Sequence, residues 1–364
     1  MRNRRHEWLP WLVFLLIFAT PTVSFAGGKI RLEKQKKTFY VPRNVSIIRV
    51  VRLKFHPTQP KFLLGQITDR RLAVWNLDDP IPEKADKNNR EKHIPPTLHC
   101  EQEQGWIRGF DIDPQGKWVA TGGSDRHLRL WQWTGQGIAS EPGNDVQAHD
   151  GWIEAVSFSP DGKWIASAGS DRMVKLWLAK DLQPVHTFTG HSGFVRDLAW
   201  SPKSDVLVST GEDGKVIAWN LNERKQVWEV DFGNVNTQQG QNPSFSGALR
   251  VAVCPDGKFV SAAGRSKLLL FDLKTGTPLA SEKVSYDVRF HPHRQILFGG
   301  TDRSKIWNYD PAQLLSSKGK KLGNPGNVVG EMRRQGEGIA FSPDGQWLAV
   351  TDRESTVAIR KLSK

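Results

Sequence analysis

Short runs of alternating apolar and polar residues fill most of the chain, as in residues 195–200 (VRDLAW). Clusters of Gly, Pro, Asp and Ser separate these runs, as in Pro160-Asp161-Gly162. Alternation with a period of two, bounded by such turn residues, is typical of β-strands. Beyond Ala26 no comparable stretch places its apolar residues at the helical period of about 3.6. The pattern therefore predicts an all-β protein built from many short strands.

A short unit occurs seven times along the chain. Residues 158–177 (FSPDGKWIASAGSDRMVKLW) and 200–219 (WSPKSDVLVSTGEDGKVIAW) are two of the copies. Each copy has a proline near its start, namely Pro57, Pro114, Pro160, Pro202, Pro255, Pro292 and Pro343. Each copy closes at a nearly constant distance from its proline, on Trp75, Trp131, Trp177, Trp219, Phe271, Trp307 and Arg360. Three strands fit each copy, and a fourth, more variable run such as residues 185–188 (VHTF) precedes the next copy. Seven units of four short strands predict a propeller.

In these motifs the chain resembles the WD-repeat family over about residues 38–364. Gly190-His191 and Ala148-His149 stand where that family has its Gly-His pair, and Asp272 alone keeps the Asp of its Trp-Asp pair. The resemblance implies a seven-bladed WD-repeat β-propeller. It also implies that an N-terminal strand, residues 37–41 (KTFYV), completes the last blade, because the last unit stops at Lys364 after its third strand. Such a strand would cover an open sheet edge.

Two adjacent units repeat the same four polar and aromatic residues. His149, Ser167, Asp171 and Trp177 recur at one constant offset as His191, Ser209, Asp213 and Trp219. Ser, His and Asp are also the components of a catalytic triad. The resemblance implies instead a structural network of hydrogen bonds inside each blade, and an enzyme has no use for one triad in two adjacent blades.

The N-terminal segment 1–26 has the layout of a secretory signal peptide. A basic start (RNRRH) precedes an uncharged run from Trp8, and Ser24-Phe25-Ala26 is a small-x-small triplet. The organisation is then a signal peptide over 1–26, an N-terminal segment with the ring-closing strand over 27–48, and the propeller over 49–364. We expect an exported protein, periplasmic or extracellular. The alternative is an uncleaved membrane anchor over 8–26, an uncharged run that is just long enough to span a bilayer.

Composition and charge narrow the function classes. The chain has 364 residues, a net charge of +13 and 15 tryptophans. Removal of the segment 1–26 leaves a net charge of +11, so the basic character belongs to the propeller and an anionic polymer is a possible ligand. The two cysteines, Cys100 and Cys254, fall in blades that are not neighbours, so we expect two free thiols.

Few residues carry recognisable chemistry. His291-Pro292-His293 offers a metal pair, but no further ligand is near it and a turn is the simpler interpretation. Phosphate loops, zinc motifs and nucleophile elbows are absent from the sequence, so we expect no catalytic residue, metal, cofactor or small-molecule substrate. Three loops exceed the repeat spacing, at residues 78–96, 234–247 and 311–326, and loops on a rigid scaffold often bind partners.

The candidate partner-binding residues follow from the phase of the repeat. The WD-repeat resemblance implies that the loop before the first strand and the turn between the second and third strands lie on one face, the top face. Three aromatic residues occupy the first position in consecutive blades, namely Trp106, Trp152 and Phe194. Five units carry an Asp-Arg pair at the second position, with Arg70, Arg126, Arg172, Arg303 and Arg353. Aromatic residues and Arg are enriched in the hot spots of protein interfaces.

The sequence thus favours a non-catalytic interaction scaffold with a protein partner on the top face. One alternative is a propeller enzyme with a site in the central channel, although no cluster of catalytic or metal-binding residues is evident there. Another is a binder of an anionic envelope polymer or of nucleic acid. Membrane contact is expected only if residues 8–26 remain as an anchor.

Signal cleavage gives the first prediction. N-terminal sequencing of the mature protein is expected to begin at or near Gly27, because the small-residue triplet directly precedes it. An intact Met1 on a membrane-bound product would show that the run over 8–26 serves as an anchor.

Overall fold

The computed structural model describes residues 31–32, 37–40, 50–68, 70–79, 96–100, 105–232, 250–264, 268–282, 287–294, 297–300, 305–309, 327–331, 338–351 and 356–363. Every regular element in these ranges is a β-strand. No helix among them has the length and apolar character needed to cross a bilayer. The segment 1–26, Arg303, Arg353 and the interiors of the three long loops lie outside the described residues.

The described strands form six four-stranded antiparallel sheets and one further sheet. We number the four-stranded sheets as blades 1 to 6 in chain order. Blade 1 contains β3 (Val50–Phe55), β4 (Phe62–Ile67), β5 (Leu72–Asn76) and β6 (Thr97–His99). Blade 2 contains β7 (Ile107–Ile112), β8 (Trp118–Gly123), β9 (His127–Trp133) and β10 (Ile138–Gln147). Blade 3 contains β11 (Ile153–Phe158), β12 (Trp164–Gly169), β13 (Val174–Leu178) and β14 (Pro184–Phe188).

The second half continues in the same order. Blade 4 contains β15 (Val195–Trp200), β16 (Val206–Gly211), β17 (Lys215–Asn220) and β18 (Lys225–Asp231). Blade 5 contains β19 (Arg250–Val253), β20 (Phe259–Ala263), β21 (Leu268–Asp272) and β22 (Pro278–Glu282). Blade 6 contains β23 (Val288–Phe290), β24 (Leu297–Gly300), β25 (Lys305–Tyr309) and β26 (Asn327–Glu331). The C-terminal sheet contains β27 (Ile339–Phe341), β28 (Trp347–Thr351) and β29 (Thr356–Ser363), and both β1 (Arg31–Leu32) and β2 (Lys37–Tyr40) pair with β29.

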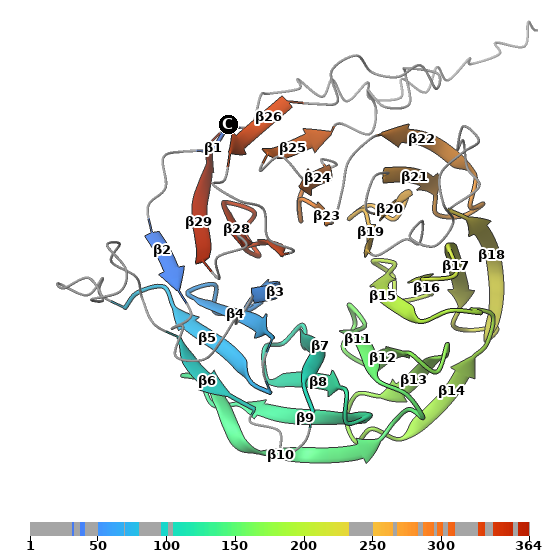
Figure 1. Cartoon of the computed structure of the whole chain (residues 1–364), viewed down its shortest axis with the longest axis horizontal. Helices are drawn as coiled ribbons and strands as arrows, with labels where there is room; N and C mark the ends of the chain where they lie inside the picture. Colours follow the sequence, from blue (N-terminus) through green and yellow to red (C-terminus); the bar gives the residue numbers. More distant parts are fainter. Residues whose placement is uncertain are drawn as a thin grey trace, which may run out of the picture.

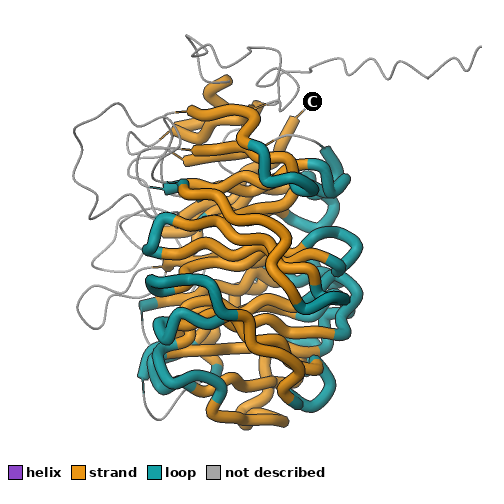
Figure 2. Tube along the Cα trace, turned by 90° about the vertical axis from the view of Figure 1, so that its right-hand side faces the viewer, coloured by secondary structure: helices purple, strands orange, loops and turns teal. Residues whose placement is uncertain are grey.

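The sheets radiate from a common centre, with the first strand of each sheet innermost (Figure 1). First strands of consecutive sheets contact one another from β7 through β27, and β27 contacts β3. Seen from the side, the turns gather at two opposite faces of the disc (Figure 2). The described chain is therefore an all-β propeller.

The core lies between the faces of neighbouring blades. Phe62 and Leu64 of blade 1, for example, pack in one cluster with Phe110 and Trp131 of blade 2. Middle strands have neighbours on both faces, so every residue of β4 is buried. This burial explains why the second run of each repeat reads as a nearly continuous apolar segment with small residues.

The residue before each anchoring proline stabilises the first turn of its blade. Ser159 Oγ accepts the Trp164 N–H at 3.0 Å, and Cys254 Sγ accepts the Phe259 N–H at 3.0 Å. A glycine in the left-handed conformation completes the turn, with φ of 72° at Gly162 and 70° at Gly257. Glycine is favoured there because a Cβ atom opposes positive φ.

Two histidines at this same position accept a turn N–H on Nδ1 and also connect neighbouring sheets. His56 Nε2 donates to the Gly116 carbonyl of blade 2 at 3.0 Å, and His291 Nε2 donates to the Gly345 carbonyl of the C-terminal sheet at 2.9 Å. Burial lowers the pKa of both imidazoles, and the bonds to the carbonyls offset this only in part. His293 Nε2 also reaches a carbonyl, that of Pro343, at 2.6 Å. Both members of the His291-Pro292-His293 pair therefore hydrogen-bond to the backbone.

The lowered histidine pKa predicts a pH-dependent stability. The unfolded chain takes up a proton at His291 near the ordinary pKa of 6.5, whereas the folded chain resists protonation. The free energy of unfolding is therefore expected to fall as the pH drops below about 6.5. In urea denaturation series from neutral to mildly acidic pH, His291→Gln is expected to lose less stability than wild type. If the free energy of unfolding depends on pH equally in the two proteins, His291 is not the group responsible.

Candidate functional site: the aromatic row and the central channel

Three exposed aromatic side chains lie in consecutive blades, each directly before the innermost strand. The exposed fractions are 60 % for Trp106, 48 % for Trp152 and 38 % for Phe194. Among the described residues only Val227 is a comparably exposed large hydrophobic side chain. We call Trp106, Trp152 and Phe194 the aromatic row.

Backbone hydrogen bonds hold the aromatic row beside the turn between the second and third strands. The Trp106 N–H donates to Ser124 Oγ at 2.7 Å, and the Trp152 N–H donates to Ser170 Oγ at 2.8 Å. In blade 4 the Glu212 N–H donates to the Phe194 carbonyl at 2.8 Å. These bonds place the aromatic row and the Asp-Arg turns on the same face of the propeller.

The described Asp-Arg arginines are exposed at this face. Arg126 and Arg172 each have a φ of 72°, and Gly214 occupies the matching position of blade 4 with a φ of 78°. Arg70 is also exposed. The left-handed conformation costs a residue with a Cβ atom roughly 1–2 kcal/mol. The backbone conformation of the turn therefore does not account for the presence of Arg at this position.

A second set of charged residues, absent from the sequence-based prediction, contacts the aromatic row. The Arg108 guanidinium lies 5.0 Å from the Trp152 ring, and the Arg196 guanidinium lies 5.7 Å from the Phe194 ring. Glu154 joins the two, with Arg108 Nε at 2.9 Å and Arg196 Nη1 at 2.8 Å. Cation–π contacts and ion pairs of this kind restrict the rotamers of exposed aromatic rings.

The repeated polar residues form closed hydrogen-bond chains within blades 3 and 4. In blade 3, His149 Nδ1 lies 2.9 Å from Asp171 Oδ2 and His149 Nε2 lies 2.7 Å from Ser167 Oγ. Trp177 Nε1 donates to the same hydroxyl at 2.8 Å. His191, Ser209, Asp213 and Trp219 repeat this chain in blade 4. Both serine hydroxyls are fully buried and occupied on both sides, so they offer no nucleophile to a substrate.

The carboxylates in these chains are stabilised in the charged form. Burial opposes ionisation of Asp171, but the His149 side chain and two backbone N–H groups more than offset it and lower its pKa. The pKa of Asp213 is lowered in the same way by His191. In each hydrogen-bond chain the carboxylate is therefore held in its charged form by the groups that donate to it.

Other blades retain only part of the network. In blade 2, Trp131 Nε1 donates to Thr121 Oγ1 at 2.8 Å, while Asp125 pairs with Arg129 at 2.5 Å. In blade 1, Gly65 takes the serine position, and a Cβ there would lie 2.7 Å from the Trp75 ring. The Trp75 ring thus occupies the space that a side chain at position 65 would need.

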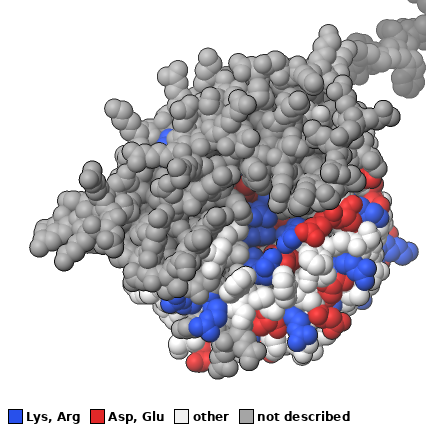
Figure 3. Space-filling model, viewed as in Figure 1, with Lys and Arg blue, Asp and Glu red and all other residues white. Residues whose placement is uncertain are grey.

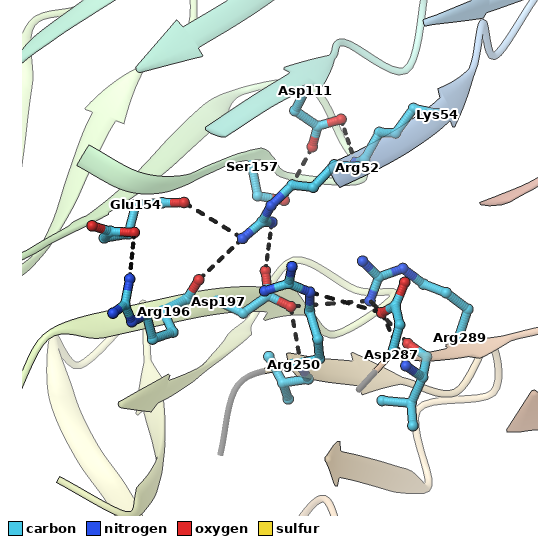
Figure 4. A network of polar contacts seen from close by, with 12 residues as sticks. Arg52, Lys54, Asp111, Glu154, Ser157, Arg196, Asp197, Arg250, Asp287 and Arg289 are labelled. Carbon is cyan, nitrogen blue, oxygen red and sulfur yellow. Dashed lines mark hydrogen bonds and ion pairs between the residues drawn. The ribbon is translucent and has the colours of Figure 1, made fainter. Parts of the chain in front are cut away.

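Charged residues from several innermost strands converge on the central channel (Figure 4). Arg52 of blade 1 reaches across the ring and donates to Asp197 of blade 4 at 2.8 Å. Arg52 also donates to the backbone carbonyls of Glu154 and Arg196, at 3.4 and 3.1 Å. The sequence-based prediction contained no such channel cluster.

Three buried carboxylates near the channel connect neighbouring sheets. Asp111 Oδ2 accepts the Phe158 N–H of blade 3 at 3.0 Å. Asp197 Oδ2 accepts the Val251 N–H of blade 5 at 3.1 Å, and Asp287 Oδ2 accepts the Ile339 N–H of the C-terminal sheet at 3.0 Å. We call Asp111, Asp197 and Asp287 the bridging carboxylates.

The part of the chain that is described contains no cluster of metal-binding residues, and its two thiols are buried. No group of three or more His, Cys, Asp or Glu residues is arranged there to hold a metal ion. Cys100 and Cys254 are free and buried. Burial raises the pKa of Cys100, and burial with a hydrogen bond to Asp256 raises the pKa of Cys254 to about 11.

A family model described as WD domain, G-beta repeat matches residues 96–132, 140–177 and 182–220. Residues 96–220 belong to the WD40 repeat family. No curated protein matches the chain. The three matched WD40 segments contain Trp106, Trp152 and Phe194, one in each. WD40 propellers are usually non-catalytic scaffolds for protein interaction, so the family suggests protein-binding partners.

The WD40 hydrogen-bond network predicts a stability change in blade 4. Ser209→Ala would leave the buried Trp219 N–H and the His191 imidazole without their shared partner. We expect a loss of about 1–3 kcal/mol in the free energy of unfolding, measured by urea denaturation. Ser192→Ala is the control, because Ser192 is an exposed serine in the same blade. An equal effect of both substitutions would contradict the structural role of Ser209.

Proposed function

We propose that this protein is an exported, non-catalytic scaffold that binds a macromolecular partner on the face carrying the aromatic row. The observation that carries the proposal is the exposure of Trp106, Trp152 and Phe194 at the same position of three consecutive blades. Exposed clusters of large aromatic residues are uncommon on proteins that bind nothing. The partner-binding residues are the aromatic row together with Arg70, Arg126, Arg172, Arg303 and Arg353, of which the last two lie outside the described residues.

The contacts of the aromatic row support this proposal. Arg108, Arg196 and Glu154 hold Trp152 and Phe194 before any partner arrives. A pre-organised surface loses less side-chain entropy on binding, which favours affinity. Aromatic and Arg side chains are also the residue types that most often dominate interface energies.

Two other functions are distinguishable from this one. An enzyme acting in the central channel would turn over a substrate, and mutation of the aromatic row would leave that turnover in place. A binder of an anionic envelope polymer or nucleic acid is favoured by the net charge of +11 that remains beyond Ala26. Its retention on heparin would fall steeply with salt.

Export and localisation form part of the proposal. The segment 1–26 supplies the basic, apolar and small-residue regions of a signal peptide, which supports a periplasmic or extracellular location. The partner would then be sought in the envelope fraction of the source organism.

We also propose a seven-bladed ring whose last blade is completed by the N-terminal segment. The pairing of β2 with β29 supports this closure, with Lys37 opposite Ile359 and Tyr40 opposite Thr356. The segment covers the outer edge of β29, which would otherwise expose unpaired backbone groups.

Mutation of the aromatic row tests the binding face. The pair Trp106→Ala, Trp152→Ala is expected to weaken capture of partners from the envelope fraction about tenfold or more. The melting temperature should change little, because substitutions of exposed residues usually shift stability by less than about 0.5 kcal/mol. Val227→Ala is the matched control, since Val227 is similarly exposed but lies on outer strand β18. Unfolding of the double variant, or wild-type capture by it, would show that these tryptophans serve only packing.

Deletion of the segment 27–44 tests the closure. Loss of the strand paired with β29 is expected to lower the melting temperature sharply, because the edge of the C-terminal sheet is then uncovered. An unchanged melting temperature would show that the segment does not close the ring.

A further inference from the structure

A β-bulge interrupts the first strand of each of blades 1 to 4 at the same place, opposite the end of the second strand. In blade 3 the pairing between β11 and β12 passes from Ile153 directly to Ala155, which leaves Glu154 as the extra residue. The extra residues of blades 1, 2 and 4 are Val51, Arg108 and Arg196. A bulge leaves its extra residue outside the regular ladder and redirects the side chain. We call Arg108, Glu154 and Arg196 the charged bulge residues.

The charged bulge residues support two members of the aromatic row. The Glu154 carboxylate lies 2.9 Å from Arg108 Nε and 2.8 Å from Arg196 Nη1. The two guanidiniums lie beside the rings of Trp152 and Phe194, at 5.0 and 5.7 Å. Burial opposes the charge of Arg196, but the nearby carboxylates, Glu154 foremost, more than offset it and raise its pKa. The bulges thus direct three paired charges toward the aromatic row.

Arg52 of blade 1 binds the backbone of two of these bulges from across the channel (Figure 4). Its guanidinium donates to the Arg196 carbonyl at 3.1 Å and to the Glu154 carbonyl at 3.4 Å. It also donates to Asp197 Oδ1 at 2.8 Å. Since β11 and β15 belong to separate sheets, a single side chain joins the backbones of two blades at their bulges.

The surroundings of Arg52 favour a firm attachment. The side chains of Arg52 and Asp197 are 14 % and 5 % exposed, so water has little access to this ion pair. Figure 3 shows Lys and Arg side chains near the centre of the molecule, beside Asp and Glu. Hydrogen bonds from a charged donor are stronger than those between neutral groups. Loss of the guanidinium would therefore remove a strong donor from both bulge carbonyls at once.

We propose that Arg52 is a positioning residue for the aromatic row. Its guanidinium fixes the bulges of blades 3 and 4, and the charged bulge residues in turn fix the Trp152 and Phe194 rings. This inference rests on the proposed function, in which the aromatic row binds the partner. Arg52 then favours binding from the channel, through Glu154 and Arg196, by keeping the rings in place before the partner arrives.

The order of the Trp152 ring tests this role without any partner. Mature protein is labelled with 5-fluorotryptophan, and Trp152→Phe identifies the Trp152 signal in fluorine NMR spectra. In Arg52→Gln this signal is expected to shift and broaden, because the Arg108 guanidinium beside the ring is no longer fixed through Glu154. Arg52→Lys keeps the charge and N–H donors, and is expected to recover part of the wild-type signal. The signal of Trp228, on outer strand β18, is the control and should not move.

Partner capture from the envelope fraction is then measured with the same variants. Arg52→Gln is expected to weaken capture about fivefold, because freed side chains must be ordered again on binding. His291→Ala is the matched control, since it removes a hydrogen bond to a carbonyl of a neighbouring sheet at another junction. It is expected to leave capture at the wild-type level.

Each remaining outcome decides the proposal. An unchanged Trp152 signal in Arg52→Gln, or an equal loss of capture in His291→Ala, would overturn it. Unfolding of both Arg52 variants would also overturn it, because Arg52 would then support the ring as a whole. If the signal changes and capture does not, the pair Trp106→Ala, Trp152→Ala separates two cases. Wild-type capture by that pair means that the proposed function fails while the positioning of the ring stands, whereas weakened capture means that binding does not need Arg52.

Discussion

The bridging carboxylates set the geometry on which the rest of the propeller depends. Asp111, Asp197 and Asp287 each accept a backbone N–H from the first strand of the next sheet, where the sheets come closest together. Each also forms an ion pair with Lys54, Arg52 or Arg289, which compensates the buried negative charge. A buried carboxylate with both kinds of partner is costly to displace. Three pairs of neighbouring sheets are thereby joined beside the channel, namely blades 2 and 3, blades 4 and 5, and blade 6 with the C-terminal sheet. Hydrophobic clusters fill the space between the sheets further out.

This central attachment explains why surface residues on different blades can act together. The aromatic row spans three blades, and its members would drift apart if the sheets moved independently. Arg52 adds a direct connection across the channel from blade 1 to blade 4, the blade that carries Phe194. The hydrogen bonds at His149 and His191 then fix the turns inside blades 3 and 4. Hydrogen-bonded turns thus connect the blades with the face that carries the aromatic row.

Sequence reasoning could predict the repeating parts of this structure but not the channel. The anchoring prolines and the constant offset between the His149 and His191 motifs reveal strands, turns and the buried network, because each depends on residues close in the chain. The channel cluster depends on contacts between residues far apart in the chain, such as Arg52 and Asp197. Irregular pairing in the first strands also changes the phase, as between Val195 and Asp197, so simple alternation does not show which charges face inward. Arg108 and Glu154 were missed beside the aromatic row for the same reason.

The two buried thiols provide built-in reporters of how the ring opens. Cys100 packs between blades 1 and 2, and Cys254 packs between blades 5 and 6. Their raised pKa values keep both in the unreactive thiol form while the sheets are in contact. Alkylation of either one therefore requires its own inter-blade seam to separate. Different labelling rates of Cys100 and Cys254 would indicate local unfolding that begins at one junction between blades. Equal rates would indicate that the whole propeller unfolds as one cooperative unit.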